Sequence, residues 1–247
     1  WARKQFRGRV VVETPWPVDP LISEIEGVDA VIDRSAPLPE YDVWAPLLSL
    51  SHLCGCIPGP PHKYLKADAD RRRQWAAQID RSKLSVAISW QGNPKFKNDA
   101  RRSIPLRYFE RLAPVEGVTL YAVQKQHGRK QLESWPTDLA LHDFGARLDE
   151  NTKPFVDTAA FLSEVDLLVT SDTAIAHLAG ALGVTVWLAL SKRPDWRWGD
   201  RGETTPWYPS MRLFRQKRAG DWTQVFDDIA AELAVRQRSA APKTDFK

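Results

Sequence analysis

The sequence predicts an α/β protein built on doubly wound parallel sheets. Short apolar runs alternate with helical segments along nearly all of the 247 residues. The run LSVAISW at Leu84–Trp90 is apolar at almost every position, which is typical of a parallel strand covered on both faces. A Pro- and Gly-rich stretch at Cys56–Leu65 interrupts the alternation, so we expect a linker between two units there.

The first unit is expected to hold short strands separated by one helix. The strands are predicted at Gly8–Thr14, Asp29–Arg34 and Tyr41–Leu50, and the helix at Pro20–Val28. The Tyr41–Leu50 segment also fits a strand followed by the start of a helix. After the linker, a polar helix is expected at Asp68–Ile79, because Asp68 is a good N-cap and acidic residues favour a helix start.

The second unit continues the alternation after Leu84–Trp90. Its further strands are predicted at Val118–Lys125, Ala140–Gly145, Asp166–Ser171, Val184–Leu190 and Met211–Gln216. Its helices are predicted at Pro105–Val115, Phe155–Val165, Thr173–Leu182 and Trp222–Gln237, the last of them amphipathic. Gly183 suits the residue that follows a helix end.

The composition limits which functional classes of protein fit the sequence. Hydrophobic residues make up 43%, charged residues 27%, and the formal net charge is +4, with no basic block dense enough to predict nucleic-acid binding. No apolar run is long enough to span a membrane and no signal peptide is recognised, so we expect a cytoplasmic protein. The two cysteines, in Cys54-Gly55-Cys56, are too few for a structural zinc site. The chain starts at Trp1 and its only methionine is Met211, so we expect an N-terminal part to be missing.

The stretch DLLVTSDTAIAHLAGALG, from Asp166 to Gly183, is the main candidate site. A helix that starts at Thr173 directs unpaired backbone N–H groups and partial positive charge toward the strand exits, which favours an anion. His177 follows one turn later on the same face. Asp172 would cap the helix or accept hydrogen bonds from sugar hydroxyls. A plain N-cap at Asp172 and a structural His177 remain the alternatives.

Other strand exits add candidates, since ligands of open α/β sheets bind at the carboxyl ends of strands. These further candidates for donor binding are Trp90, Gln91, Gly92, Asn93 and Lys125. Lys125 would balance the charge of a leaving group, whereas Trp90 is equally compatible with a core position and a stacking face. Arg101, Arg102 and Ser103 would form an anion clamp, or a basic loop with no ligand. Dinucleotide, P-loop and hydrolase signatures are missing from the sequence.

The sequence resembles a bacterial glycosyltransferase family that commonly carries tetratricopeptide repeats, is similar to heptosyltransferase family 9, and is distantly similar to O-linked N-acetylglucosamine transferases. The resemblance covers about residues 8–233. It rests on VAISWQGNPKFKNDARRSIPL, LYAVQK, the Phe155–Leu190 segment and RPDWRWGDRGETTPWYPSMRLFRQ. The Asp172-Thr173-Ala174 and His177 block, combined with Asp195–Trp198, is the most specific part.

The resemblance implies a GT-B fold, in which two Rossmann-like domains face a cleft. It implies an incomplete N-terminal acceptor-side domain at residues 1–66 and a donor-binding domain at 67–220. A helix at 221–238 would cross back to the first domain, and 239–247 would be a tail. Family members often have glycine where Ala174 stands, so the approach of phosphate would differ slightly here.

The implied activity is metal-independent sugar transfer from a nucleotide-sugar to a protein or glycan hydroxyl, with no cofactor and no metal ligand. Thr173, Ala174 and His177 would hold the pyrophosphate, Asp172 the sugar, and Lys125 would offset charge. The base is expected in the missing N-terminal part, as are the repeats, which are possible partners. A catalytically silent scaffold and a nucleotide-sugar epimerase are the alternatives. Nucleobase, sugar, acceptor and stereochemical outcome are not predicted.

Overall fold

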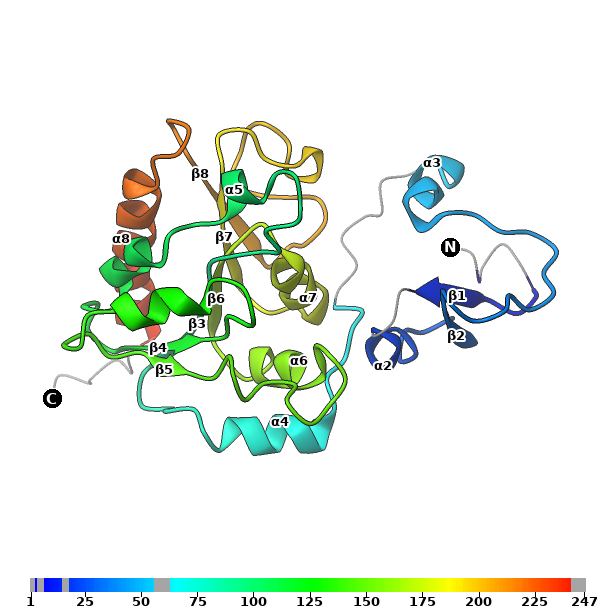
Figure 1. The fold of residues 1–247 in the computed structure, drawn as a ribbon, viewed down its shortest axis with the longest axis horizontal. Coiled ribbons are helices and arrows are strands. Elements are labelled where there is room, and N and C mark those ends of the chain that lie inside the picture. The colour runs from blue at the N-terminus through cyan, green and yellow to red at the C-terminus, as the bar shows by residue number, and fades with distance from the viewer. Residues whose placement is uncertain (1–2, 4–6, 15–17, 56–62, 241–247) are drawn as a thin grey trace, which may run out of the picture.

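A computed structural model of the chain describes residues 3, 7–14, 18–55 and 63–240, and it shows two parallel sheets (Figure 1). The predicted linker lies largely outside the described residues, as do Cys56 and the last seven residues of the expected tail. Within the described part of the chain, no helix has the length and apolar character needed to cross a membrane. The predicted domain boundaries remain predictions.

The N-terminal unit contains one short β-α-β arrangement. Strands β1 (Val11–Thr14) and β2 (Ala30–Asp33) pair in parallel, and helix α2 (Asp19–Ile22) connects them. Pro20 occupies the first turn of α2, where its missing N–H costs nothing. Leu21 is buried and belongs to the same hydrophobic cluster as Leu65 and Leu178 of the second unit. Lys153 also pairs with Asp19, 2.6 Å between Nζ and Oδ2, so both contacts join the two units.

The second unit is a six-stranded, all-parallel sheet. Its strands are β3 (Leu84–Ser89), β4 (Val118–Ala122), β5 (His142–Asp143), β6 (Leu167–Ser171), β7 (Val186–Leu190) and β8 (Met211–Arg215). Their spatial order is β5-β4-β3-β6-β7-β8. The chain winds outward from β3 in one direction and then returns to its other side at β6, as in a doubly wound sheet. The central strands are buried almost completely, which explains their continuous apolar sequences.

Helices cover both faces of this sheet. The helices on one face are α4 (Ala69–Ala76), α6 (Val156–Leu162) and α7 (Ala174–Leu182), and the other face carries the 3₁₀ helix η2 (Leu106–Leu112) and α8 (Thr223–Ala240). Asp68 caps α4 as predicted, because its carboxylate accepts the Arg71 N–H at 2.8 Å. Gly183 has φ 76° and ends α7, as its sequence position indicated.

The remaining short elements lie in the connections. They are η1 (Leu47–Ser49), α3 (Leu50–Leu53), α5 (Asp99–Arg102), η3 (Arg129–Ser134) and η4 (Trp196–Trp198).

Three sequence predictions differ from the structure. The strand predicted in Tyr41–Leu50 is wrong, because Val43 and Trp44 are exposed without a neighbouring strand, whereas the helix start predicted in the same segment is confirmed by η1 and α3. The helix predicted at Pro105–Val115 is a 3₁₀ helix. The final helix packs on η2 and β8, on the side of the large sheet away from β1 and β2 (Figure 1), so it does not make the predicted crossing.

Candidate functional site

The candidate site lies where the winding of the sheet reverses. Strands β3 and β6 are neighbours, but the chain leaves β3 toward η2 on one face and leaves β6 into α7 on the other. A crevice therefore opens at their carboxyl ends, and such switch points are where doubly wound sheets bind ligands.

Gly92 and Thr173 meet at this crevice. A Cβ atom added to Gly92 would lie 3.1 Å from Thr173 Cγ2, 2.5 Å from Asp99 Oδ1 and 2.8 Å from an Arg102 guanidinium nitrogen. A Cβ would overlap these atoms, so glycine is required for the close approach of Gly92 to Thr173. Thr173 is the N-cap residue of α7 and no side chain caps the helix, which leaves its first N–H groups without a side-chain partner.

The loop after β3 brings a cation to the crevice. Asp99 is buried, and its carboxylate accepts hydrogen bonds from Arg102 Nε at 3.2 Å and Ser103 Oγ at 2.8 Å. Ser103 Oγ in turn accepts the Gly92 N–H at 3.2 Å. Arg102 is thereby held beside Gly92, and its charge influences both Asp172 and His177.

Two aromatic side chains fix His177. Its imidazole stacks on Trp198, with ring centroids 5.1 Å apart and planes 22° apart, and its Nδ1 lies 3.1 Å from the Tyr208 hydroxyl. The Tyr208 ring packs directly over Gly180, where an added Cβ would lie 2.5 Å from a ring carbon. The small residues of α7 therefore admit this ring, and His177 is oriented by its neighbours rather than free to rotate.

Burial sets the charge states around the crevice. It raises the pKa of Asp172, although the indole N–H of Trp198 and the charges of His177 and Arg102 partly oppose this rise. Burial also lowers the pKa of His177 and outweighs the attraction of Asp172, so the imidazole is neutral at neutral pH. For Asp195, burial opposes ionisation, but hydrogen bonds from Arg197 prevail and its pKa is lowered.

Two buried polar atoms beside Asp172 have no hydrogen-bond partner of ordinary geometry among the described residues. They are Ser171 Oγ, at the end of β6, and Trp198 Nε1, although the Trp198 N–H still acts on the Asp172 carboxylate electrostatically. Unsatisfied buried polar atoms are uncommon in native proteins, and they gather at sites where a ligand supplies the partner.

Gln124 organises the exits of β3 and β4, and it was not among the predicted site residues. Its Oε1 accepts hydrogen bonds from the N–H groups of Trp90 at 2.8 Å and Gln91 at 2.9 Å. Its Nε2 donates to the carbonyl oxygens of Gln91 and His127, both at 2.8 Å. The sequence signal was a polar amide directly after the apolar run of a strand, a position where burial demands several hydrogen bonds.

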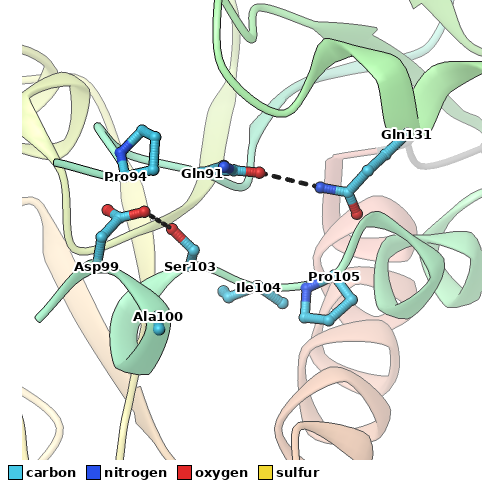
Figure 2. Close-up of a pocket in the computed structure, with 8 residues that line it drawn as sticks. All are labelled: Gln91, Pro94, Asp99, Ala100, Ser103, Ile104, Pro105 and Gln131. Atoms are coloured by element: carbon cyan, nitrogen blue, oxygen red, sulfur yellow. Dashed lines mark hydrogen bonds between the residues drawn. The ribbon is translucent and has the colours of Figure 1, made fainter.

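A cavity of about 300 Å³ adjoins the crevice beside the β3 exit (Figure 2). Gln91, Asp99 and Ser103 line it together with Gln131, which donates from Nε2 to Gln91 Oε1 at 3.2 Å. Asn93 is exposed and its side chain accepts the Lys95 N–H at 3.0 Å, which shapes the turn.

Trp90 and Lys125, which the sequence predicted to bind the donor, make other contacts in the structure. Trp90 is fully buried against Phe109 and donates to the Gly128 carbonyl at 3.1 Å, so its ring is part of the core and is closed to a ligand. Lys125 lies at the end of β4, where its ammonium group donates to the Leu148 carbonyl and sits 3.5 Å from Asp149 Oδ2. Among the described contacts none joins Lys125 to Thr173, whereas Arg102 lies beside Gly92 at the crevice.

Comparison with known proteins connects this geometry to one fold. The chain is 25% identical over 210 residues to protein FlbA of Caulobacter vibrioides, a match that covers 81% of this chain and 35% of FlbA. The chain therefore spans about a third of the length of this curated relative. No protein-family model matches the sequence.

Two solved structures resemble the chain in fold over most of its length. The E. coli ADP-heptose LPS heptosyltransferase II superposes with a TM-score of 0.59 at 11% identity, over 96% of this chain and 91% of that protein. A glycosyl transferase family 9 protein from Veillonella parvula gives 0.52 at 11% identity, over 85% of this chain and 64% of its own. At such identities the likeness concerns the fold, and the chain has the GT-B fold of these glycosyltransferases.

Proposed function

We propose that this protein is a glycosyltransferase that moves a sugar from a nucleotide-sugar donor to an acceptor hydroxyl without a metal ion. The observation that carries the proposal is the meeting of Gly92 with the uncapped N-terminus of α7 at the switch point of the sheet. Backbone N–H groups, a helix dipole and a close backbone approach that glycine permits support a site for a diphosphate.

The described side chains have distinct tasks in this proposal. Arg102 and the first turn of α7 stabilise the negative charge that grows on the diphosphate as the bond between the sugar C1 and the phosphate oxygen breaks. Neutral His177 donates a hydrogen bond rather than a charge, since burial keeps it unprotonated. Asp172 accepts hydrogen bonds from sugar hydroxyls. We assign no described residue as the base that takes the acceptor proton when the new C1–O bond forms.

Ligand-dependent thermal stability tests the proposal. The protein is melted alone and with UDP-, ADP-, GDP-, TDP- and CMP-sugars, because a ligand at one hundred times its dissociation constant stabilises by about 2.7 kcal/mol. We expect one nucleotide class to raise the midpoint. Arg102→Gln and His177→Gln should reduce that shift by at least about half, measured from each variant's own unliganded midpoint.

Arg107→Gln is the matched control, since it removes an exposed arginine from η2, away from the crevice. The Arg107 variant should keep the full shift. A folded wild-type protein that responds to none of the donors would contradict the proposal and favour a scaffold without turnover. Release of free sugar or its transfer, read by mass spectrometry, separates a transferase from an epimerase, which changes the donor sugar itself.

A further inference from the structure

Exposed cations and aromatic rings gather on the two loops that border the crevice. Lys95, Lys97 and Arg101 follow β3, and Lys192 and Arg193 follow β7; all five are exposed. Within the described chain none of these five side chains forms an ion pair with a carboxylate. We call these five residues, with Phe96 and Trp196, the basic rim.

Two carboxylates in the same loops are already engaged. Asp99 binds Arg102 and Ser103, and Asp195 pairs with Arg197 at 2.8 Å. Asp200 also lies in the loop after β7, but one carboxylate does not balance five cations, so the basic rim keeps a net positive charge. Such an uncompensated patch raises the local concentration of anions and speeds their encounter with the protein.

Each loop also presents an exposed aromatic ring with an arginine against it. Phe96 is 48% exposed and lies 4.3 Å from the Arg102 guanidinium carbon, measured to the ring centroid. Trp196 is 67% exposed, and Arg197 lies 4.7 Å from its ring centroid. Arg102 lies beside Gly92, and Trp198, two residues after Trp196, stacks on His177, so the two loops border the same crevice. Large exposed rings beside cations are typical of polypeptide-binding surfaces.

We propose that the basic rim binds an acidic, extended polypeptide segment and presents a hydroxyl side chain of that segment at the crevice. The role of the basic rim as an acceptor site rests on the proposed glycosyl transfer. The binding of an acidic peptide to the rim does not depend on that transfer. Strand β6 lies between β3 and β7, so the ends of the two strands from which the cation-bearing loops start are about 10 Å apart. In an extended chain, acidic residues three or four positions apart span about the same distance.

The charge pattern favours a polypeptide over a nucleic acid. Asp172 lies between the two cation groups, and Asp195 and Asp200 lie in the β7 loop. A phosphodiester backbone carries a charge at every nucleotide and would place some against these carboxylates. A peptide with glutamates on either side of a serine avoids them, because its charges are spaced.

Fluorescence anisotropy tests the proposal on the full chain. The probe is a fluorescein-labelled peptide with the repeat Glu-Gly-Ser-Gly-Glu, compared with the same peptide carrying glutamine for glutamate and with an oligothymidylate of similar length. We expect the acidic peptide to bind, and its affinity to fall about tenfold or more when salt shortens the Debye length from about 10 Å to about 3 Å. The double variant Lys192→Gln/Arg193→Gln should bind it at least about fivefold more weakly.

The matched control, Lys83→Gln/Arg238→Gln, removes the same charge from exposed positions before β3 and near the end of α8. It should bind the acidic peptide as the wild type does. Equal binding of the glutamine peptide, tighter binding of the oligonucleotide, or equal losses in both double variants would overturn the proposal. Donor-induced stabilisation, measured beside peptide binding on the wild-type protein, separates the two hypotheses. A donor shift without binding of the acidic peptide contradicts only the basic-rim proposal, whereas peptide binding without any donor shift contradicts only the proposed transfer.

Discussion

The hydroxyl of Tyr208 decides how His177 faces the crevice. If the hydroxyl donates to Nδ1 at 3.1 Å, the proton of the neutral imidazole sits on Nε2, where it can serve a ligand. Burial raises the pKa of Tyr208, so the hydroxyl keeps its proton. One phenol thus selects the tautomer of the histidine.

Tyr208→Phe should therefore alter the histidine more than the fold. The ring that packs over Gly180 is kept, so we expect a loss of about 1 kcal/mol in unfolding free energy, the value of one hydrogen bond. The ¹⁵N chemical shifts of His177 should move toward a mixture of tautomers, and the donor-induced stabilisation should shrink. Unchanged shifts would show that the hydroxyl does not set the tautomer.

The pH dependence of stability gives a second test at this scale. The unfolded histidine titrates near 6.5 and burial lowers the pKa of folded His177, so the unfolded state binds more protons as pH falls through this range. This contribution is present above pH 6.5 and is lost below it. Asp172 acts in the opposite sense, because its raised pKa gives stability that is lost as pH rises above 3.8.

Comparison with His177→Gln isolates the histidine. Urea unfolding between about pH 8 and pH 5 should show the wild type losing more stability than the variant. Parallel curves for the two proteins would mean that His177 titrates as it does in the unfolded chain.

At the scale of elements, α7 depends on residues without side-chain bulk. Gly180→Ala would place a Cβ 2.5 Å from Tyr208 Cγ, and an aromatic ring cannot yield as a flexible side chain does. Alanine gains about 1 kcal/mol in helix propensity, but we expect a net loss of about 1–2 kcal/mol from overpacking. Thermal and urea unfolding measure it.

Gly8→Ala serves as its control, because nothing lies within 4 Å of a Cβ at Gly8. The control should unfold as the wild type does. A Gly180 variant that is more stable than the wild type would show that Tyr208 moves aside without cost.

The secondary-structure elements also show how much of the fold can be predicted from the sequence. Periodicity located the strands of the large sheet, since continuous apolar runs occur only where both faces are covered. The run at Tyr41–Leu50 has similar residue types but no partner strand, and pairing is not encoded in a local pattern. Thr173 and Gly92 were identified from their places at strand exits. That Trp90 is core and that Lys125 engages Leu148 and Asp149 depend on burial and distant partners, which the sequence does not display.

At the scale of the whole molecule, the two units share one hydrophobic cluster through Leu21. Leu21→Ala should weaken the N-terminal unit by about 2 kcal/mol while the six-stranded sheet stays intact. Hydrogen exchange should then show faster exchange at Val12 and Val31 and unchanged protection at Ile88 and Val169.

Leu48→Ala is the control for this change, since Leu48 is 75% exposed and its truncation should leave exchange unaltered. Equal acceleration in both sheets would instead mean that the molecule unfolds as a single cooperative unit.

The amide of Gln124 holds two strand ends together. Because this one buried side chain is hydrogen-bonded to the backbone after β3 and to the backbone after β4, the ends of these two strands are fixed relative to each other. Gly92 directly follows Gln91, so the backbone that approaches Thr173 is anchored through the amide of a different strand exit.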